Sequence, residues 1–86
     1  MVRERERLAR LEPGGAPDRP IALVSASLVE VRARSMPCPI CGSEVRVADH
    51  TAETLEGQPL RLAHTRCPSC GYEGIVYFAL RAPVVN

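Results

Sequence analysis

The sequence predicts a small, mostly-β domain of three or four antiparallel strands that needs more than its hydrophobic core for stability. Three observations carry this prediction: the chain has 86 residues, only three are aromatic, and its four cysteines form two closely spaced pairs. A chain of this size buries only about 60 % of the surface that its unfolded form exposes. Disulfides or a bound metal ion usually supplement so thin an aliphatic core.

The first twenty residues are predicted to lie outside the globular part. Residues 1–12 read MVRERERLARLE and predict a short charged helix or a disordered arm, because twelve residues without a strong cap are marginal as an isolated helix. Residues 13–20 hold three prolines and two glycines, which is typical of a linker. We therefore divide the chain into an arm and linker, residues 1–20, and a globular domain, residues 21–86.

Residues 21–34 are strand-like in composition, since aliphatic residues alternate with small ones and then with the charged residues 30, 32 and 34. We expect one strand or two short ones. Residues 21–31 are more apolar than a small sheet requires. We expect them to cover the sheet as an extra strand or to pair with the edge of a partner, including a second copy of the chain.

Residues 45–49 and 60–66 both alternate apolar and polar side chains and predict the two arms of a hairpin. The stretch between them, residues 50–59, is acidic and rich in turn-forming residues, so we expect an exposed loop. If Val47 lies opposite Leu62, one face of the hairpin carries five residues: Val45, Val47, Leu60, Leu62 and His64.

That register predicts structural roles for the two histidines. His64 would be half-buried near the second cysteine pair, with a role as a metal ligand as the alternative, and His50 would lie at the exposed tip. No serine or cysteine remains with a base beside it, which excludes a nucleophilic triad. The histidines therefore predict no active site.

Residues 75–80 (IVYFAL) are the most continuous apolar segment and predict the central strand, which Pro83 prevents from continuing far. No run of 18 apolar residues predicts a membrane span. The charged N-terminus is unlike a signal peptide. We therefore expect a cytoplasmic location, where thiols stay reduced.

The cysteines carry the strongest signal. Cys38 and Cys41 lie in CPICG and Cys67 and Cys70 in CPSCG, with 25 residues between the pairs. Two such pairs around a hairpin-length spacer predict a tetrahedral site of four thiolates, and a glycine after each pair permits the positive φ that turns backbone N–H groups toward sulfur. Disulfides would need an oxidising compartment, and a redox pair would need a βαβ unit. We predict one structural Zn²⁺, with iron as the second candidate.

These motifs resemble a known family. CPICG at residues 38–42, the strand-rich spacer and CPSCGY at residues 67–72 are similar to a zinc ribbon, the rubredoxin-like zinc-binding fold. The stretch Leu55-Glu56-Gly57 adds a similarity to bacterial CPxCG-type zinc-binding domains. The resemblance covers residues 35–80 and implies two metal-binding knuckles on a three-stranded antiparallel sheet. It does not specify an activity, since zinc ribbons occur in many processes.

Two subfamilies of the zinc ribbon can be tested on the residues. Transcript-cleavage ribbons carry an adjacent Asp-Glu pair at the hairpin tip, whereas here Glu53 and Glu56 are separated by two residues. Rubredoxins surround iron with aromatic side chains and are strongly acidic, whereas this chain has three aromatic residues and a formal charge of +1. Neither cleavage chemistry nor electron transfer is therefore favoured.

We accordingly predict a non-enzymatic zinc module that acts by binding protein within a larger assembly. The alternative is a zinc ribbon that contacts nucleic acid in transcription or translation through Arg46, Arg61 and Arg66. Charge does not favour this alternative, because four thiolates and one Zn²⁺ bring the formal charge of +1 to about −1. One-sided burial of a sheet already explains why each arginine alternates with an apolar neighbour.

Overall fold

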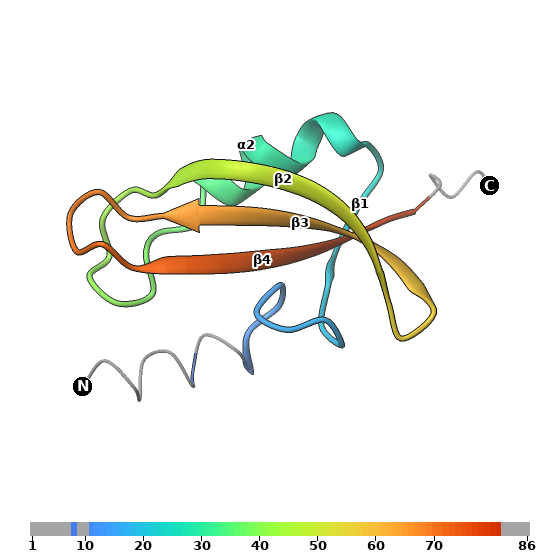
Figure 1. Ribbon diagram of the computed structural model, residues 1–86. Helices are drawn as coiled ribbons and strands as arrows, with labels where there is room; N and C mark the ends of the chain where they lie inside the picture. The colour runs from blue at the N-terminus through green and yellow to red at the C-terminus, as the bar shows by residue number, and fades with distance from the viewer. Residues whose placement is uncertain (1–7, 9–10, 82–86) are drawn as a thin grey trace.

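A computed structural model describes Leu8 and residues 11–81 (Figure 1). Its elements in chain order are β1 (Ile21–Leu23), the 3₁₀ turn η1 (Ala26–Leu28), α2 (Val29–Arg34), β2 (Arg46–Leu55), β3 (Gln58–Arg66) and β4 (Glu73–Leu80). Leu8 and Leu11 are helical, and the rest of the helix or arm predicted over residues 1–12 lies mostly outside the described residues.

The four strands form one sheet in the order β1-β4-β3-β2. β2, β3 and β4 make an antiparallel meander, whereas β1 runs parallel to β4, so the sheet is mixed. The prediction of a wholly antiparallel sheet is wrong for β1, because η1 and α2 carry the chain across one face from the β1 edge to the β2 edge (Figure 1). The central place predicted for residues 75–80 is confirmed, since β4 lies between β1 and β3.

The prediction of a strand beyond Leu23 is wrong, because the chain forms the 3₁₀ turn η1 and the helix α2 there. The Ser25 hydroxyl accepts a hydrogen bond from the Ser27 N–H at 3.2 Å and caps η1. Val29 and Ala33, four residues apart, are fully buried against the sheet, whereas Val31 is 55 % exposed. The strand of residues 21–31 offered for pairing with a second copy is therefore limited to Ile21–Leu23, which already pairs with β4.

The helix and the sheet enclose the main core. Val29 and Ala33 of α2 pack on Ala63 of β3 and Phe78 of β4. On the opposite face of the sheet, a second cluster is made by Leu60, Leu62 and Ala79. No helix within the described part of the chain has the length and apolar character needed to cross a membrane.

The hairpin of β2 and β3 is confirmed, but its loop is far shorter than predicted. Both strands continue to a two-residue turn at Glu56 and Gly57, whose φ angles of 52° and 78° are those of a type I′ turn. Because of this turn and a bulge after Val47, Val47 lies opposite Thr65. Val47 and Leu62 consequently lie on opposite faces, and the single face predicted for Val45, Val47, Leu60, Leu62 and His64 is wrong.

The Pro/Gly segment, residues 13–20, packs on the sheet instead of standing free as a linker. Gly14 is buried with φ +82°, and its carbonyl accepts a hydrogen bond from the Tyr77 N–H at 2.8 Å. A Cβ atom at this position would come within 2.9 Å of Val76. The close approach therefore requires glycine, and the domain boundary at residues 20 and 21 stays a prediction.

Candidate metal centre

Four cysteine sulfurs meet at one end of the sheet. The Sγ atoms of Cys38, Cys41, Cys67 and Cys70 all lie within 4.8 Å of one another. The Cys38–Cys70 and Cys41–Cys67 pairs are 3.7 Å and 3.5 Å apart. A tetrahedral ion with Zn–S bonds of about 2.3 Å separates its ligands by about 3.8 Å, so the four sulfurs can hold one metal ion with little movement.

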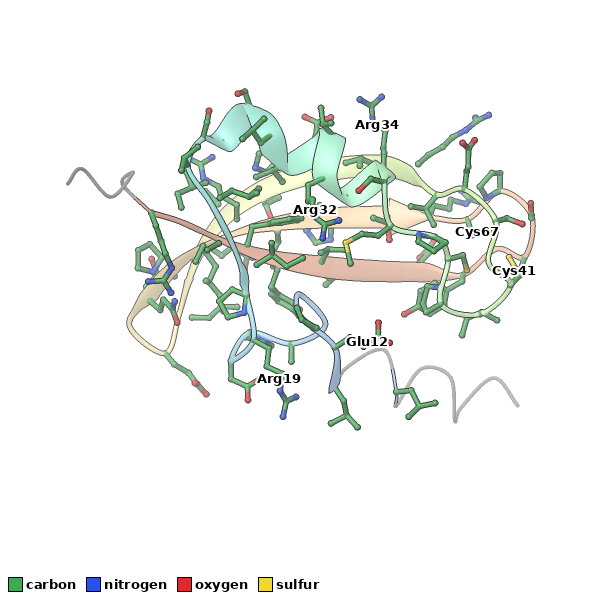
Figure 2. The ribbon with its side chains drawn as sticks, turned by 180° about the vertical axis from the view of Figure 1, so that it is seen from behind. Glu12, Arg19, Arg32, Arg34, Cys41 and Cys67 are labelled. Carbon is green, nitrogen blue, oxygen red and sulfur yellow. The ribbon has the colours of Figure 1, made fainter. Side chains whose placement is uncertain are left out.

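Two loops bring the sulfurs together. Cys38 and Cys41 lie between α2 and β2, and Cys67 and Cys70 lie between β3 and β4, so antiparallel pairing puts both loops at the same end of the sheet (Figure 2). Cys38 and Cys67 are buried, whereas Cys41 and Cys70 are exposed. One cysteine of each pair thus anchors its loop in a third buried cluster, which Cys38 and Cys67 form with Val45.

The two loops repeat one backbone pattern. In the first, the Cys38 N–H donates to the Ser43 carbonyl at 2.8 Å and the Gly42 N–H donates to the Cys38 carbonyl at 2.9 Å. Cys67, Tyr72 and Gly71 repeat these two bonds in the second loop, each at 2.8 Å. Gly42 and Gly71 both have φ of 79°, which confirms the positive φ predicted after each cysteine pair.

Backbone and hydroxyl groups point at the sulfurs, as a charged thiolate cluster requires. The Ile40 N–H donates to Cys38 Sγ at 3.4 Å. Hydrogen bonds from the Ser43 side chain and then from its N–H lower the pKa of Cys41 to about 6. These hydrogen bonds favour the thiolate of Cys41, which is the form that binds a metal ion.

Cys70 resists ionising beside that thiolate. The Tyr72 N–H favours the thiolate of Cys70, but removal from water and hydrogen bonds with the other three sulfurs raise the pKa of Cys70 to about 12. Four thiols this close cannot all lose their protons without a cation among them. A divalent metal ion supplies that charge, and thiolates are the ligands that Zn²⁺ or iron prefers.

Neither histidine belongs to this group of ligands. His64 is half-buried, as predicted, and its Nε2 lies 3.1 Å from the Thr51 hydroxyl. His50 does not lie at the hairpin tip, because β2 continues five residues beyond it. Its Nδ1 is 3.8 Å from a carboxylate oxygen of Glu30 on α2, and its Nε2 is buried with no hydrogen-bond partner among the described residues.

The three arginines predicted to contact nucleic acid do not share one surface. Arg46 and Arg66 lie directly opposite each other beside the cysteine loops. Arg61 lies opposite Phe78, on the face covered by α2, near the middle of β3. Five residues of strand, about 17 Å, separate Arg61 from Arg66, and an odd separation puts their side chains on opposite faces.

Sequence reasoning missed two supporting residues of this centre. Ser43 donates to the Cys41 sulfur, and the signal was a hydroxyl residue directly after the glycine of the first motif. Gly74 leaves room for the Tyr72 ring, since a Cβ there would lie 2.8 Å from the ring. That role carried no signal in the sequence, because it depends on contact across the loop.

Comparisons with known proteins add no family to this geometry: no family model matches the sequence, and neither the curated proteins nor the solved structures contain a match. The four-cysteine cluster is compatible with a zinc ribbon, and it gives the chain a site able to bind a metal ion.

Proposed function

We propose that this chain is a non-enzymatic module built around one structural Zn²⁺, and that it binds protein within a larger cytoplasmic assembly. The observation that carries the metal assignment is the set of four sulfurs within 4.8 Å of one another. Reduced thiols are the soft ligands that Zn²⁺ takes in structural sites, and a set of four closes its coordination sphere. Closed coordination leaves no position for a substrate, which supports a structural role over catalysis.

Exposed apolar side chains support the interaction role. Leu28 and Val31, three residues apart where η1 passes into α2, are 40 % and 55 % exposed, and Val24, just before η1, is 61 % exposed. Three large exposed aliphatic side chains within eight residues are more typical of a contact surface than of a solvated face.

Metal analysis of the purified protein tests the first half of this proposal. We expect one zinc per chain, and loss of both zinc and native circular dichroism in Cys38→Ser, because metal affinity contributes directly to folding here. A folded protein without zinc or iron would refute the metal assignment. Visible thiolate-to-iron absorption would instead assign iron.

Affinity capture from the protein's own cells tests the second half. Zinc-loaded bait should retain a defined protein that a Leu28→Ser/Val31→Ser bait loses, while the zinc content of that bait stays at one per chain. Equal recovery of the partner with both baits would show that these exposed aliphatic residues do not bind it.

A second candidate function rests on the pairing of Arg46 with Arg66. Like charges directly opposite each other on a sheet are destabilising, and a phosphate group between the two guanidinium groups would relieve this repulsion. Binding to a single-stranded oligonucleotide should then weaken with salt and with Arg46→Gln, while Arg61→Gln leaves it unchanged. Absence of binding at low salt would dismiss this candidate.

A further inference from the structure

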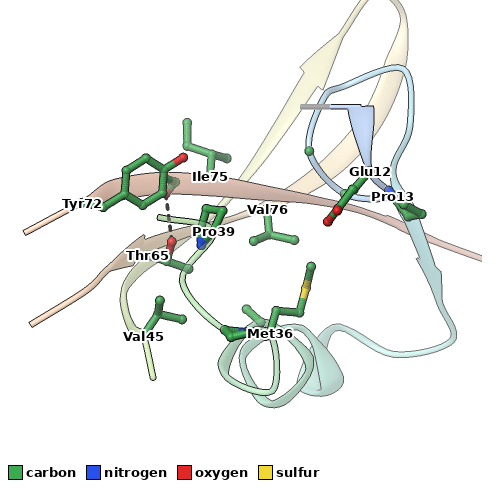
Figure 3. Close-up of a pocket in the computed structure, with 14 residues that line it drawn as sticks. Glu12, Pro13, Met36, Pro39, Val45, Thr65, Tyr72, Ile75 and Val76 are labelled. Carbon is green, nitrogen blue, oxygen red and sulfur yellow. Dashed lines mark hydrogen bonds between the residues drawn. The ribbon is translucent and has the colours of Figure 1, made fainter. Parts of the chain in front are cut away.

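A cavity of about 100 Å³ opens beside the metal centre (Figure 3). It lies where four parts of the chain meet: the N-terminal turn with Gly14, the end of α2 with Met36, the first cysteine loop with Pro39, and β4 with Val76. Because these parts are far apart in the sequence, only the folded chain forms the cavity.

The walls of the cavity are apolar. Aliphatic, proline and methionine side chains make up most of the lining, and the Tyr72 ring, which also packs against the buried cluster of Cys38, Val45 and Cys67, lines one side. The Thr65 hydroxyl donates to the Gly74 carbonyl at 3.3 Å, so its hydrogen is already used. A hydrocarbon chain of about four carbons suits a space of this size and character.

One charge breaks this apolar lining. Glu12 is the only charged side chain among the described residues that line the cavity, and Figure 3 shows its carboxylate directed inward, toward Val76. No ion pair joins this carboxylate to another residue that the structure describes. The cavity therefore suits a ligand with an apolar stem, which contacts the apolar walls, and a cationic end, which pairs with the Glu12 carboxylate.

We infer that this cavity receives an arginine side chain from a protein partner. The inference rests on the proposed function, because it names the chemistry by which such a partner is recognised. The aliphatic stem lies against Met36 and Val76, and the planar guanidinium donates to the Glu12 carboxylate. Arginine suits the site better than lysine, since its fork matches the two carboxylate oxygens and it is more weakly hydrated.

The probes for this inference are n-butylguanidinium and its neutral isostere n-butylurea, titrated into ¹⁵N-labelled, zinc-loaded protein and followed by NMR. The cation should shift the amides of Gly14, Met36 and Gly74, with a dissociation constant on the order of 10 mM for a ligand of this size. It should bind about fivefold more tightly than the urea. Glu12→Gln should abolish this preference, whereas Glu56→Gln, at the distant hairpin turn, should keep it.

Three results would overturn the inference: equal binding of the cation and the urea, an unchanged preference in Glu12→Gln, or shifts confined to other acidic residues. A dispersed amide spectrum shows that each variant is folded. Zinc content measured on the same samples separates the two proposals. Protein that lacks the metal counts against the proposed function, whereas zinc-loaded protein without cation preference counts against the arginine site alone.

Discussion

Replacing Gly14 by alanine tests whether the N-terminal Pro/Gly segment is part of the fold. Gly14 has φ +82°, and an added Cβ would lie 2.8 Å from Ile21 Cδ1 and 2.9 Å from Val76 Cγ1. A left-handed conformation costs an L-residue about 1–2 kcal/mol, and overpacking against the fixed Val76 methyl adds about 1 kcal/mol or more. Gly14→Ala should therefore lower the free energy of unfolding by about 2–4 kcal/mol.

Gly57→Ala is the matched control, because Gly57 has φ 78° but nothing within 4 Å of an added Cβ. It carries only the conformational term, about 1–2 kcal/mol. Urea denaturation of both zinc-loaded variants gives the difference, and hydrogen exchange at the Tyr77 amide, which donates to Gly14, reports whether the segment has detached. Equal losses of stability with unchanged Tyr77 protection would refute this packing.

Three further predictions concern the helix, the turn and the sulfurs. Val29→Ala should lower the free energy of unfolding, measured by urea denaturation, by about 2 kcal/mol, because Val29 is fully buried. Val31→Ala, at an exposed residue, should change it by less than about 0.5 kcal/mol. Similar losses in the two variants would favour a strand, in which both residues share a face. Glu56→Asn should stabilise the protein by about 0.5–1 kcal/mol in the same assay, since asparagine tolerates the φ of 52° better than glutamate, and a loss of stability would argue against the type I′ turn. The lowered pKa of Cys41, about 6, keeps its thiolate available above pH 6, so zinc affinity in a chelator competition should fall as the pH drops from 7.5 to 5.5; an affinity that does not change with pH would contradict thiolate ligation.

The cysteine site was predictable because its information is local. Each loop is predicted by a motif of five residues, in which the two cysteines are followed by a glycine that takes φ of 79°. The sequence could also predict the hairpin arms and the central strand, where alternation or apolar length extends over several residues. The described structure confirms these elements and the meeting of the sulfurs.

The helix over residues 29–34 is too short to be recognised from the sequence pattern. Six residues do not separate a period of 3.6 from a period of 2, so the charges at 30, 32 and 34 fit the alternation of a strand equally well. The overlooked signals were Ser25, which caps the 3₁₀ turn that leads into this helix, and the apolar residues Val29 and Ala33 at helical spacing.

The predictions for the hairpin turn and for the position of His50 were wrong for a related reason. The type I′ turn has glutamate at its first position, where asparagine followed by glycine would be the recognisable signal. Without that signal, the sequence predicts a loop of ten residues, whereas the turn has two. That error displaced the register and put His50 at the tip, although it lies beside Glu30 of α2. Gly14 was assigned to a linker because its contacts with Ile21 and Val76 exist only after folding.

X-ray absorption at the zinc edge of the purified protein tests the central claim most directly. We predict four sulfur ligands at about 2.3 Å from a single ion, in keeping with four Sγ atoms that lie within 4.8 Å of one another. Fewer than four sulfurs, or nitrogen or oxygen ligands at about 2.0–2.2 Å, would contradict it.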